Sequence, residues 1–249
     1  MILLKLSYLG TAYNGFQVQP NGITVQQRLQ DAAEAVFGKR YPVTGCSRTD
    51  SGVHANEFYC TIGVPEISLN VKLTSVPSAM NARLPKDISV SECFSVDENF
   101  HPRYNALYKE YLYLILNRRQ RDPFLNYRAY HYPRALNIPL MNEAAARFVG
   151  RFDFASFTAS GSGAADTVRN ILHFRAEQNE GLVSVKIAGD GFLYNMVRIL
   201  TGTLIYVSEG KINAEHIEEI ILSRDRKKAG PTLPPHGLYL NKVVYGEFQ

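Results

Sequence analysis

Residues 41–64 read YPVTGCSRTDSGVHANEFYCTIGV and predict two short strands joined by a small, glycine-containing connection. The residues on both sides of the connection are rich in β-branched and aromatic types, which favour strands. Within it, Arg48 and Asp50 lie two residues apart, and Gly52 permits a backbone conformation that other residues avoid. An ion pair across such a turn would lower the pKa of the carboxyl group. A turn aspartate that hydrogen-bonds to its own backbone fits the same residues.

The elements around this connection predict an α/β sandwich in the first half of the chain. Thr24 can cap a helix that ends at Gly38, and Pro77 weakens a second helix. The predicted order is β-α-β-β-α-β, which is the ferredoxin-like arrangement. Its strands are residues 2–8, 41–47, 57–64 and 87–96, and its helices are residues 24–38 and 68–85.

The second half echoes this order of elements without any repeat at the level of sequence. We therefore expect an α+β fold of two ferredoxin-like halves, residues 1–103 and 104–249, whose largely antiparallel sheets meet at a central basic cleft. A composition of small residues predicts a flexible loop at 158–166. The predicted elements of this half are strands at 107–117, 171–178, 182–189 and 238–248, and helices at 140–150, at 192–210 and from about Asn213.

The excess positive charge lies in one segment of the chain. The net charge is +4, and residues 101–134 carry seven Lys and Arg against two Asp and Glu. The same segment holds seven of the 15 tyrosines. Basic residues interleaved with aromatic rings suit a nucleic acid. The same pattern fits a strand pair with Tyr, Lys and Arg on its solvent-facing side.

Composition also bears on location and cofactors. No stretch approaches the roughly 20 apolar residues that cross a bilayer, so we expect no membrane partner. The N-terminus reads as a first strand and not as a signal peptide. Three cysteines without CxxC spacing argue against disulfides and zinc and fit the cytoplasm, with Cys46 expected as a small buried residue. The sequence contains no GxGxxG and no P-loop, and we expect neither cofactor nor metal.

The octapeptide RTDSGVHA (48–55) resembles the Arg-Thr-Asp-x-Gly-Val-His-Ala signature of the TruA-type tRNA pseudouridine synthases. Further stretches resemble this family in the same order along almost the whole chain. They are YLGTAYNGFQVQ (8–19), TVQQRL (24–29), FHPRYNALYKEYLY (100–113), GRFDFASF (150–157), FLYNMVRILTG (192–202) and PPHGLYL (234–240). The chain departs from the pattern at Leu9, Phe16, Ser51 and Pro234, where aspartate, tryptophan, alanine and alanine are usual. The first two departures leave open which substrate contacts that loop makes.

The resemblance implies an enzyme that isomerises uridine to pseudouridine at positions 38, 39 and 40 in the anticodon arm of tRNA. It also implies a homodimer that needs no cofactor. A base stacked in an RNA stem must be flipped into a pocket before it can react. Two other functions stay open: an RNA-binding module without chemistry, and a pseudouridine synthase that acts at another RNA site.

The resemblance also assigns roles. Asp50 would be the catalytic carboxylate, as a nucleophile at the sugar or as a base on a ribose proton. Arg48 would pair with Asp50 or fill the gap left by the flipped base. Tyr111 would stack on the uracil, where it can also help to move the C5 proton, and Leu238 would form an apolar wall. The other expected substrate-binding residues are Arg198, Lys109, Arg103, Arg169 and His54.

Some of these side chains have a second interpretation. His54 is better suited to order the loop by hydrogen bonding than to transfer protons. Arg198 lies in an apolar helix and needs a partner, which we expect to be Asp50 or another acid. Arginines 118, 119 and 121 are expected to contact phosphates. The basic run at 224–228 could contact phosphates or form a solvated face.

Overall fold

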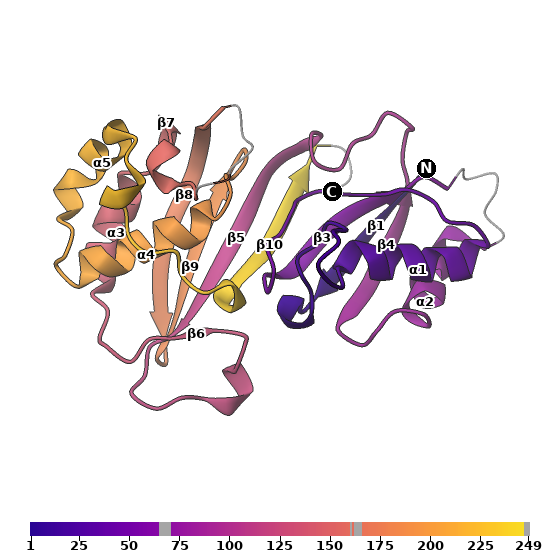
Figure 1. The fold of residues 1–249 in the computed structure, drawn as a ribbon, viewed down its shortest axis with the longest axis horizontal. Coiled ribbons are helices and arrows are strands. Elements are labelled where there is room, and N and C mark those ends of the chain that lie inside the picture. The colour runs from indigo at the N-terminus through magenta and orange to yellow at the C-terminus, as the bar shows by residue number, and fades with distance from the viewer. Residues whose placement is uncertain (65–70, 160, 162–165, 247–249) are drawn as a thin grey trace. The chain divides into compact units, whose positions relative to one another are not determined.

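The computed structural model describes residues 1–64, 71–159, 161 and 166–246. These residues form two compact units (Figure 1). The first unit comprises Met1–Leu107 and Tyr239–Gln249, and the second comprises Tyr108–Leu238. No helix in the described part of the chain combines the length and the apolar character that crossing a bilayer requires.

The first unit has the predicted order of elements, β-α-β-β-α-β. Strands β1, β3 and β4 are antiparallel neighbours in the order β4-β1-β3, and β2 pairs antiparallel with β3. Figure 1 shows α1 and α2 together on one face of this sheet. The bounds are β1 (Ile2–Tyr8), α1 (Val25–Phe37), β2 (Val43–Gly45), β3 (His54–Ile62), α2 (Val76–Asn81) and β4 (Ile88–Ser95).

Helix α1 begins and ends at the residues that the sequence indicates. The side chain of Thr24 accepts a hydrogen bond from the backbone N–H of Gln27, and Gly38 closes the helix in the left-handed conformation. Val25, Leu29 and two alanines are buried on its inner face. The second predicted helix, 68–85, is shorter in the structure. Only Val76–Asn81 is α-helical, with Pro77 in its first turn, and residues 65–70 lie outside the described residues.

The second unit carries a four-stranded antiparallel sheet in the order β5-β9-β8-β7. The short β6 pairs parallel with the end of β5. In Figure 1, helices α3 and α4 lie against this sheet, and the connection that carries β6 loops away from it. The bounds are β5 (Ala106–Leu116), β6 (Tyr130–His131), α3 (Ile138–Ala146), β7 (Gly150–Asp153), β8 (Val168–Asn179), β9 (Leu182–Gly189), α4 (Met196–Ser208) and α5 (Ile217–Ser223).

Two details of the second unit differ from the prediction. Helix α4 begins at Met196 and not at residue 192, because Asn195 before it adopts a left-handed conformation with φ of 60°. Asparagine tolerates that conformation better than most residues do. Strand β7 was not predicted, and it pairs with the start of β8. The loop predicted at 158–166 lies partly outside the described residues.

The closing strand has a partner that the sequence does not predict. We assign residues 238–248 to the second half, and the structure groups Tyr239 onward with the first unit. There β10 (Leu238–Tyr245) runs parallel to β3, with Tyr239 opposite His54 and Leu240 opposite Ala55. Strand β2 occupies the other end of the same edge, from Val43 opposite Ile62. Strands β2 and β10 therefore share this edge of β3. Local periodicity does not reveal such a long-range parallel pairing.

Candidate active site

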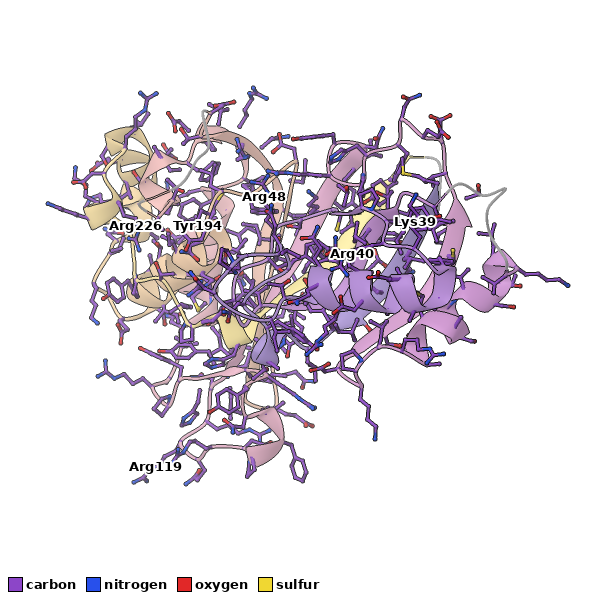
Figure 2. All side chains as sticks on the ribbon, turned by 45° about the vertical axis from the view of Figure 1, so that its right-hand side comes forward. Lys39, Arg40, Arg48, Arg119, Tyr194 and Arg226 are labelled. Carbon is purple, nitrogen blue, oxygen red and sulfur yellow. The ribbon has the colours of Figure 1, made fainter. Side chains whose placement is uncertain are left out.

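Asp50 lies in the connection between β2 and β3, as the sequence predicts. The backbone N–H of Val53 donates to the carbonyl of Asp50 at 3.2 Å and closes a four-residue turn. Gly52, at the third position, has φ of 79°, the region where glycine is favoured. Asp50 is half-buried, and Arg48, which is labelled in Figure 2, is exposed. The turn thus presents a carboxylate on a fixed backbone.

The end of β1 and the segment that follows it hold this loop by hydrogen bonds. The hydroxyl groups of Tyr8 and Thr49 hydrogen-bond at 2.8 Å, and both side chains are buried. The N–H of Phe16 donates to the carbonyl of Thr49, and the N–H of Gly52 donates to that of Tyr13. Backbone groups that leave water need such partners, so these contacts determine where the loop can lie.

Two glycines in this segment allow the backbones to approach closely. A Cβ atom on Gly10 would lie 1.9 Å from the carbonyl oxygen of Val53. A Cβ atom on Gly15, where φ is 80°, would lie 2.6 Å from that of Thr49. Neither contact leaves room for a side chain, because the opposing atoms belong to the main chain. The fit between the two loops therefore requires glycine at both positions.

His54 orders this junction. Its imidazole is fully buried, and Nδ1 accepts a hydrogen bond from the N–H of Gly10 at 2.8 Å. The ring also packs against Tyr239, with centroids 4.6 Å apart. A ring nitrogen that accepts from a backbone N–H carries no proton of its own. This geometry favours the loop-ordering interpretation of His54 over direct substrate binding, since its side chain has no exposed surface.

Phe16 explains how the chain tolerates the absence of the tryptophan that is usual at this position. Its ring is buried and stacks on Phe58, with centroids 4.4 Å apart and an interplanar angle of 28°. A side chain on Gly45 would collide with it. Phe16 is thus a core residue beneath the loop. Leu9, the second departure, bonds through its backbone N–H to the carbonyl of Asp87.

We expect the Tyr8→Phe and Thr49→Val substitutions to weaken both the fold and the reaction. Each leaves one buried hydroxyl without this partner, which costs about 1 kcal/mol in the free energy of unfolding. The loop then loses a tether, and we expect kcat to fall about tenfold, short of the hundredfold that a 1 Å displacement can cost. Urea unfolding and turnover of each single and the double variant measure these effects. Strictly additive losses would contradict a direct bond, because residues in contact couple.

A second group of candidate residues lies around the turn that joins β9 to α4 in the second unit. Lys109 pairs with Gly189 and Tyr111 with Ile187 in the β5–β9 ladder. The ring of Tyr111 meets Phe192 edge-on, with centroids 5.1 Å apart. Both Lys109 and Tyr111 are buried, with 7% exposed surface each. The structure therefore places a lysine and a phenol beside residues 189–192.

Two arginines flank the same turn. The side chain of Arg169 passes beside Gly191 and donates to the carbonyls of Asp166 and Val168. Arg198, in the first turn of α4, donates from Nε to the carbonyl of Leu233 at 2.6 Å and from its guanidinium to the side chain of Asn195. These bonds give the guanidinium a fixed orientation. The structure thus places Tyr111 and Arg169 beside residues 191–192, with Lys109 opposite Gly189 and with Arg198 a few residues further along the chain in α4.

Leu238 and Arg103 complete the set of predicted site residues. Leu238 is 5% exposed and follows a short 3-10 turn, Pro235–Gly237, that packs on Tyr113. The Tyr113 hydroxyl donates to the carbonyl of Pro234 at 2.7 Å, which anchors this turn. Arg103 belongs to the first unit, is exposed, and lies over the ring of Tyr104 at 5.8 Å.

The basic run at 224–228 is not one solvated face. Arg226 is partly buried and donates to the carbonyl of Gly230 and the hydroxyl of Thr232, and burial lowers its pKa. Arg224 forms an ion pair with Asp153 at 2.8 Å. Two of the cations in this run therefore hold the fold together.

Sequence reasoning missed the residues that position the site. Tyr8, Thr49 and Gly10 act on the loop through contacts that join residues about 40 positions apart, and Asn195 holds Arg198. The available signal was the pair of glycines in YLGTAYNGF, since glycine marks close approach of backbones. The described residues contain no group of three His, Cys, Asp or Glu side chains arranged to hold a metal ion.

Comparison with known proteins gives concordant matches. The family described as "tRNA pseudouridine synthase" matches residues 144–246. A "tRNA pseudouridine synthase A" of Thermoanaerobacter sp. (strain X514) is 42% identical over 246 residues, which cover 98% of this chain and 99% of the relative. A protein of the same name from Acetivibrio thermocellus is 43% identical, over 98% of this chain and 99% of the relative. Another, from Syntrophomonas wolfei, is 41% identical, over 99% of this chain and 98% of the relative.

Among solved structures, the chain has a weak likeness to one chain of "Crystal Structure of a Cbf5-Nop10-Gar1 Complex". The TM-score is 0.34 at 11% identity, over 98% of this chain and 57% of the other. A likeness of that size supports no argument about fold or function. The assignment to a family therefore rests on the proteins that are similar in sequence.

Proposed function

Because the chain belongs to the tRNA pseudouridine synthase A family, it isomerises uridine to pseudouridine in tRNA, and we propose that Asp50 is the residue at the centre of that reaction. The observation that carries the proposal is the turn of residues 50–53. It holds an acidic residue in a loop whose backbone is bonded at Thr49 and at Gly52 to the segment after β1. Such preorganisation is what a reacting group requires.

The reaction exchanges one bond for another within the same nucleotide. The bond between N1 of uracil and C1′ of ribose breaks, and a bond between C5 and C1′ forms. The proton leaves C5, and N1 gains one, so that atoms balance without an oxidant or reductant. The carboxylate of Asp50 serves this exchange as a nucleophile at C1′ or as a base on a ribose proton. Both roles need the ionised form, which a carboxylate ordinarily has near neutrality.

The second unit supplies the groups that we propose to receive the base. Tyr111 offers a phenol ring whose orientation is fixed by Phe192, and we assign it the stacking role on uracil. Arg198 and Lys109 bring positive charge to the same unit, which suits the phosphates beside a flipped nucleotide. Arg48 is exposed, and its proposed role is to pair with Asp50 or to fill the gap that the base leaves. Leu238 is proposed as an apolar wall.

The finer features of the proposal come from the resemblance to the family. We propose the anticodon arm, at positions 38, 39 and 40, as the substrate region, and a cytoplasmic homodimer as the working form. We propose that both units are ferredoxin-like sandwiches. The element order β-α-β-β-α-β and the strand order β4-β1-β3-β2 of the first unit support this for that unit.

Release of tritium tests the function directly. We expect the protein to release label from tRNA that carries 5-³H-uridine, because C5 must lose its hydrogen when it bonds to the sugar. Chemical mapping of the product then identifies the modified positions. An RNA-binding module without chemistry would retain all of the label. Release of label from positions outside the anticodon arm would support the alternative of a synthase for another RNA site.

A further inference from the structure

The connection between β5 and α3 carries most of the net positive charge of the chain. Residues 118–131, which we name the arginine arm, contain four arginines and one aspartate, a net charge of +3 within a chain of net charge +4. Arg119 and Arg121 are exposed, and Figure 2 shows Arg119 directed outward from this connection. A concentration of one sign on an exposed loop marks a binding surface for an anion.

The tip of the arginine arm exposes aromatic side chains to solvent. Phe124 is 87% exposed, and Tyr127 is 57% exposed. The short 3-10 turn Pro123–Leu125 presents Phe124, and the Asp122 side chain caps this turn by accepting a hydrogen bond from the N–H of Phe124 at 2.9 Å. Tyr127 has φ of 55°, which is unfavourable for a bulky residue. Such strain is typical of sites held in shape for a ligand.

Hydrogen bonds join the two ends of the arginine arm. The His131 ring bonds to the carbonyl of Arg118 at 2.9 Å, and the N–H of Tyr132 donates to that of Leu116. The guanidinium of Arg118 bonds to the carbonyl of Glu180 in the β8–β9 turn. Arg118 therefore anchors the base of the arm. A loop closed in this way loses little conformational entropy on binding.

A second anchor follows the arm. The Tyr132 hydroxyl and the Arg134 guanidinium both donate to the carboxylate of Glu209, at the end of α4. Lys211 adds an ion pair at 2.7 Å. The hydrogen bond from Lys211 makes the largest contribution, and together these donors lower the pKa of Glu209 to about 2. The carboxylate therefore stays ionised in any neutral buffer. The arm is thereby fixed to α4, the helix that carries Arg198.

The arginine arm also reaches the surroundings of the candidate site in its own unit. The ring of Tyr127 meets that of His236 edge-on, with centroids 6.2 Å apart. His236 lies in the turn before Leu238. Burial and, to a smaller extent, the charge of Arg198 lower the pKa of His236. An RNA held by the second unit can therefore meet the arm.

We propose that the arginine arm is a separate RNA-binding surface, at which Arg119 and Arg121 contact phosphates and Phe124 stacks on an unpaired base of the substrate. The inference deepens the proposed function, because it takes tRNA as that substrate. The planar guanidinium matches phosphate geometry, and stacking on an aromatic ring is tolerant of base identity. A second protein chain fits less well, since the core of a protein interface is depleted of charge.

Paired charge variants test the arm. We compare Arg119→Gln/Arg121→Gln with a matched control, Lys39→Gln/Arg40→Gln, which removes two positive charges from the exposed residues after α1 (Figure 2). For the arm variant we expect KM for tRNA to rise about tenfold with kcat unchanged, because the lost contacts bind ground state and transition state alike. The slope of log affinity against log salt should fall by about two, one for each phosphate contact. The control should retain the wild-type KM.

Phe124→Ala tests the stacking contact separately. We expect affinity to fall about tenfold with the salt slope unchanged, since an uncharged ring releases no counterions. Wild-type KM and slope in all arm variants would overturn the proposal, and so would an equal loss in the Lys39/Arg40 control. A change in sedimentation of Phe124→Ala without a change in RNA affinity would identify a self-association surface instead. Absence of tritium release by the unaltered protein would refute the proposed function, whereas the binding measurements would still decide the role of the arm.

Discussion

We expect the Asp50→Asn variant to form no measurable pseudouridine while it still binds tRNA. The amide keeps the size of the side chain but can act neither as the nucleophile nor as the base, and loss of such a group lowers kcat by at least about 10⁴-fold. The backbone bonds of the turn do not involve the replaced group. Tritium release and affinity for tRNA measure the two properties independently.

Two further variants separate charge from position at Asp50. Asp50→Glu retains the carboxylate but lengthens the side chain by one methylene, and we expect a large loss of kcat, because a displacement of about 1 Å costs on the order of a hundredfold. Asp31→Asn serves as the matched control, since this aspartate is exposed on α1 and pairs with Arg40. Substantial turnover by Asp50→Asn, with Asp31→Asn unaffected, would remove Asp50 from the centre of the reaction.

The position of the loop that carries Asp50 could be predicted because its signals are local. Strand-forming residues flank a short stretch with Gly52, and the structure places β2 and β3 on either side of it. The α1 helix was equally clear from Thr24 and Gly38. The expectation of a buried Cys46 is confirmed, and its sulfur accepts a hydrogen bond from the N–H of Tyr59. In each case the deciding interactions lie within a few residues along the chain.

The remaining features depend on contacts that are distant in sequence. The parallel pairing of β10 with β3 joins residues about 185 positions apart, and nothing in its alternating pattern names the partner. The buried bonds of Arg226 could not be distinguished from a solvated face, because charge alone does not say which way a side chain turns. The roles proposed for Asp50 and Tyr111 come from the resemblance to the family and not from periodicity. The positioning bond between Tyr8 and Thr49 became visible only in three dimensions.

The second large effect is expected at Gly10. A Cβ atom in Gly10→Ala would lie 1.9 Å from the carbonyl oxygen and 2.6 Å from the carbonyl carbon of Val53, so a backbone must move. Any such movement strains the buried bond from the N–H of Gly10 to Nδ1 of His54. Overpacking costs about 1–3 kcal/mol, and an unsatisfied buried group costs about as much again. We therefore expect the free energy of unfolding to fall by about 3 kcal/mol or more, as measured by urea denaturation.

The effect of Gly10→Ala on the reaction should exceed its effect on folding. The displaced carbonyl belongs to the residue that closes the Asp50 turn, so a shift there moves the carboxylate, and we expect turnover to be lost even at temperatures where the variant is folded. Gly38→Ala is the matched control. It forces alanine into a left-handed conformation with φ of 74°, but it meets no atom within 4 Å and lies at the end of α1. It should lose about 1 kcal/mol of stability and keep its turnover. Equal turnover in the two folded variants would mean that the contact between Gly10 and Val53 stabilises the unit without positioning Asp50.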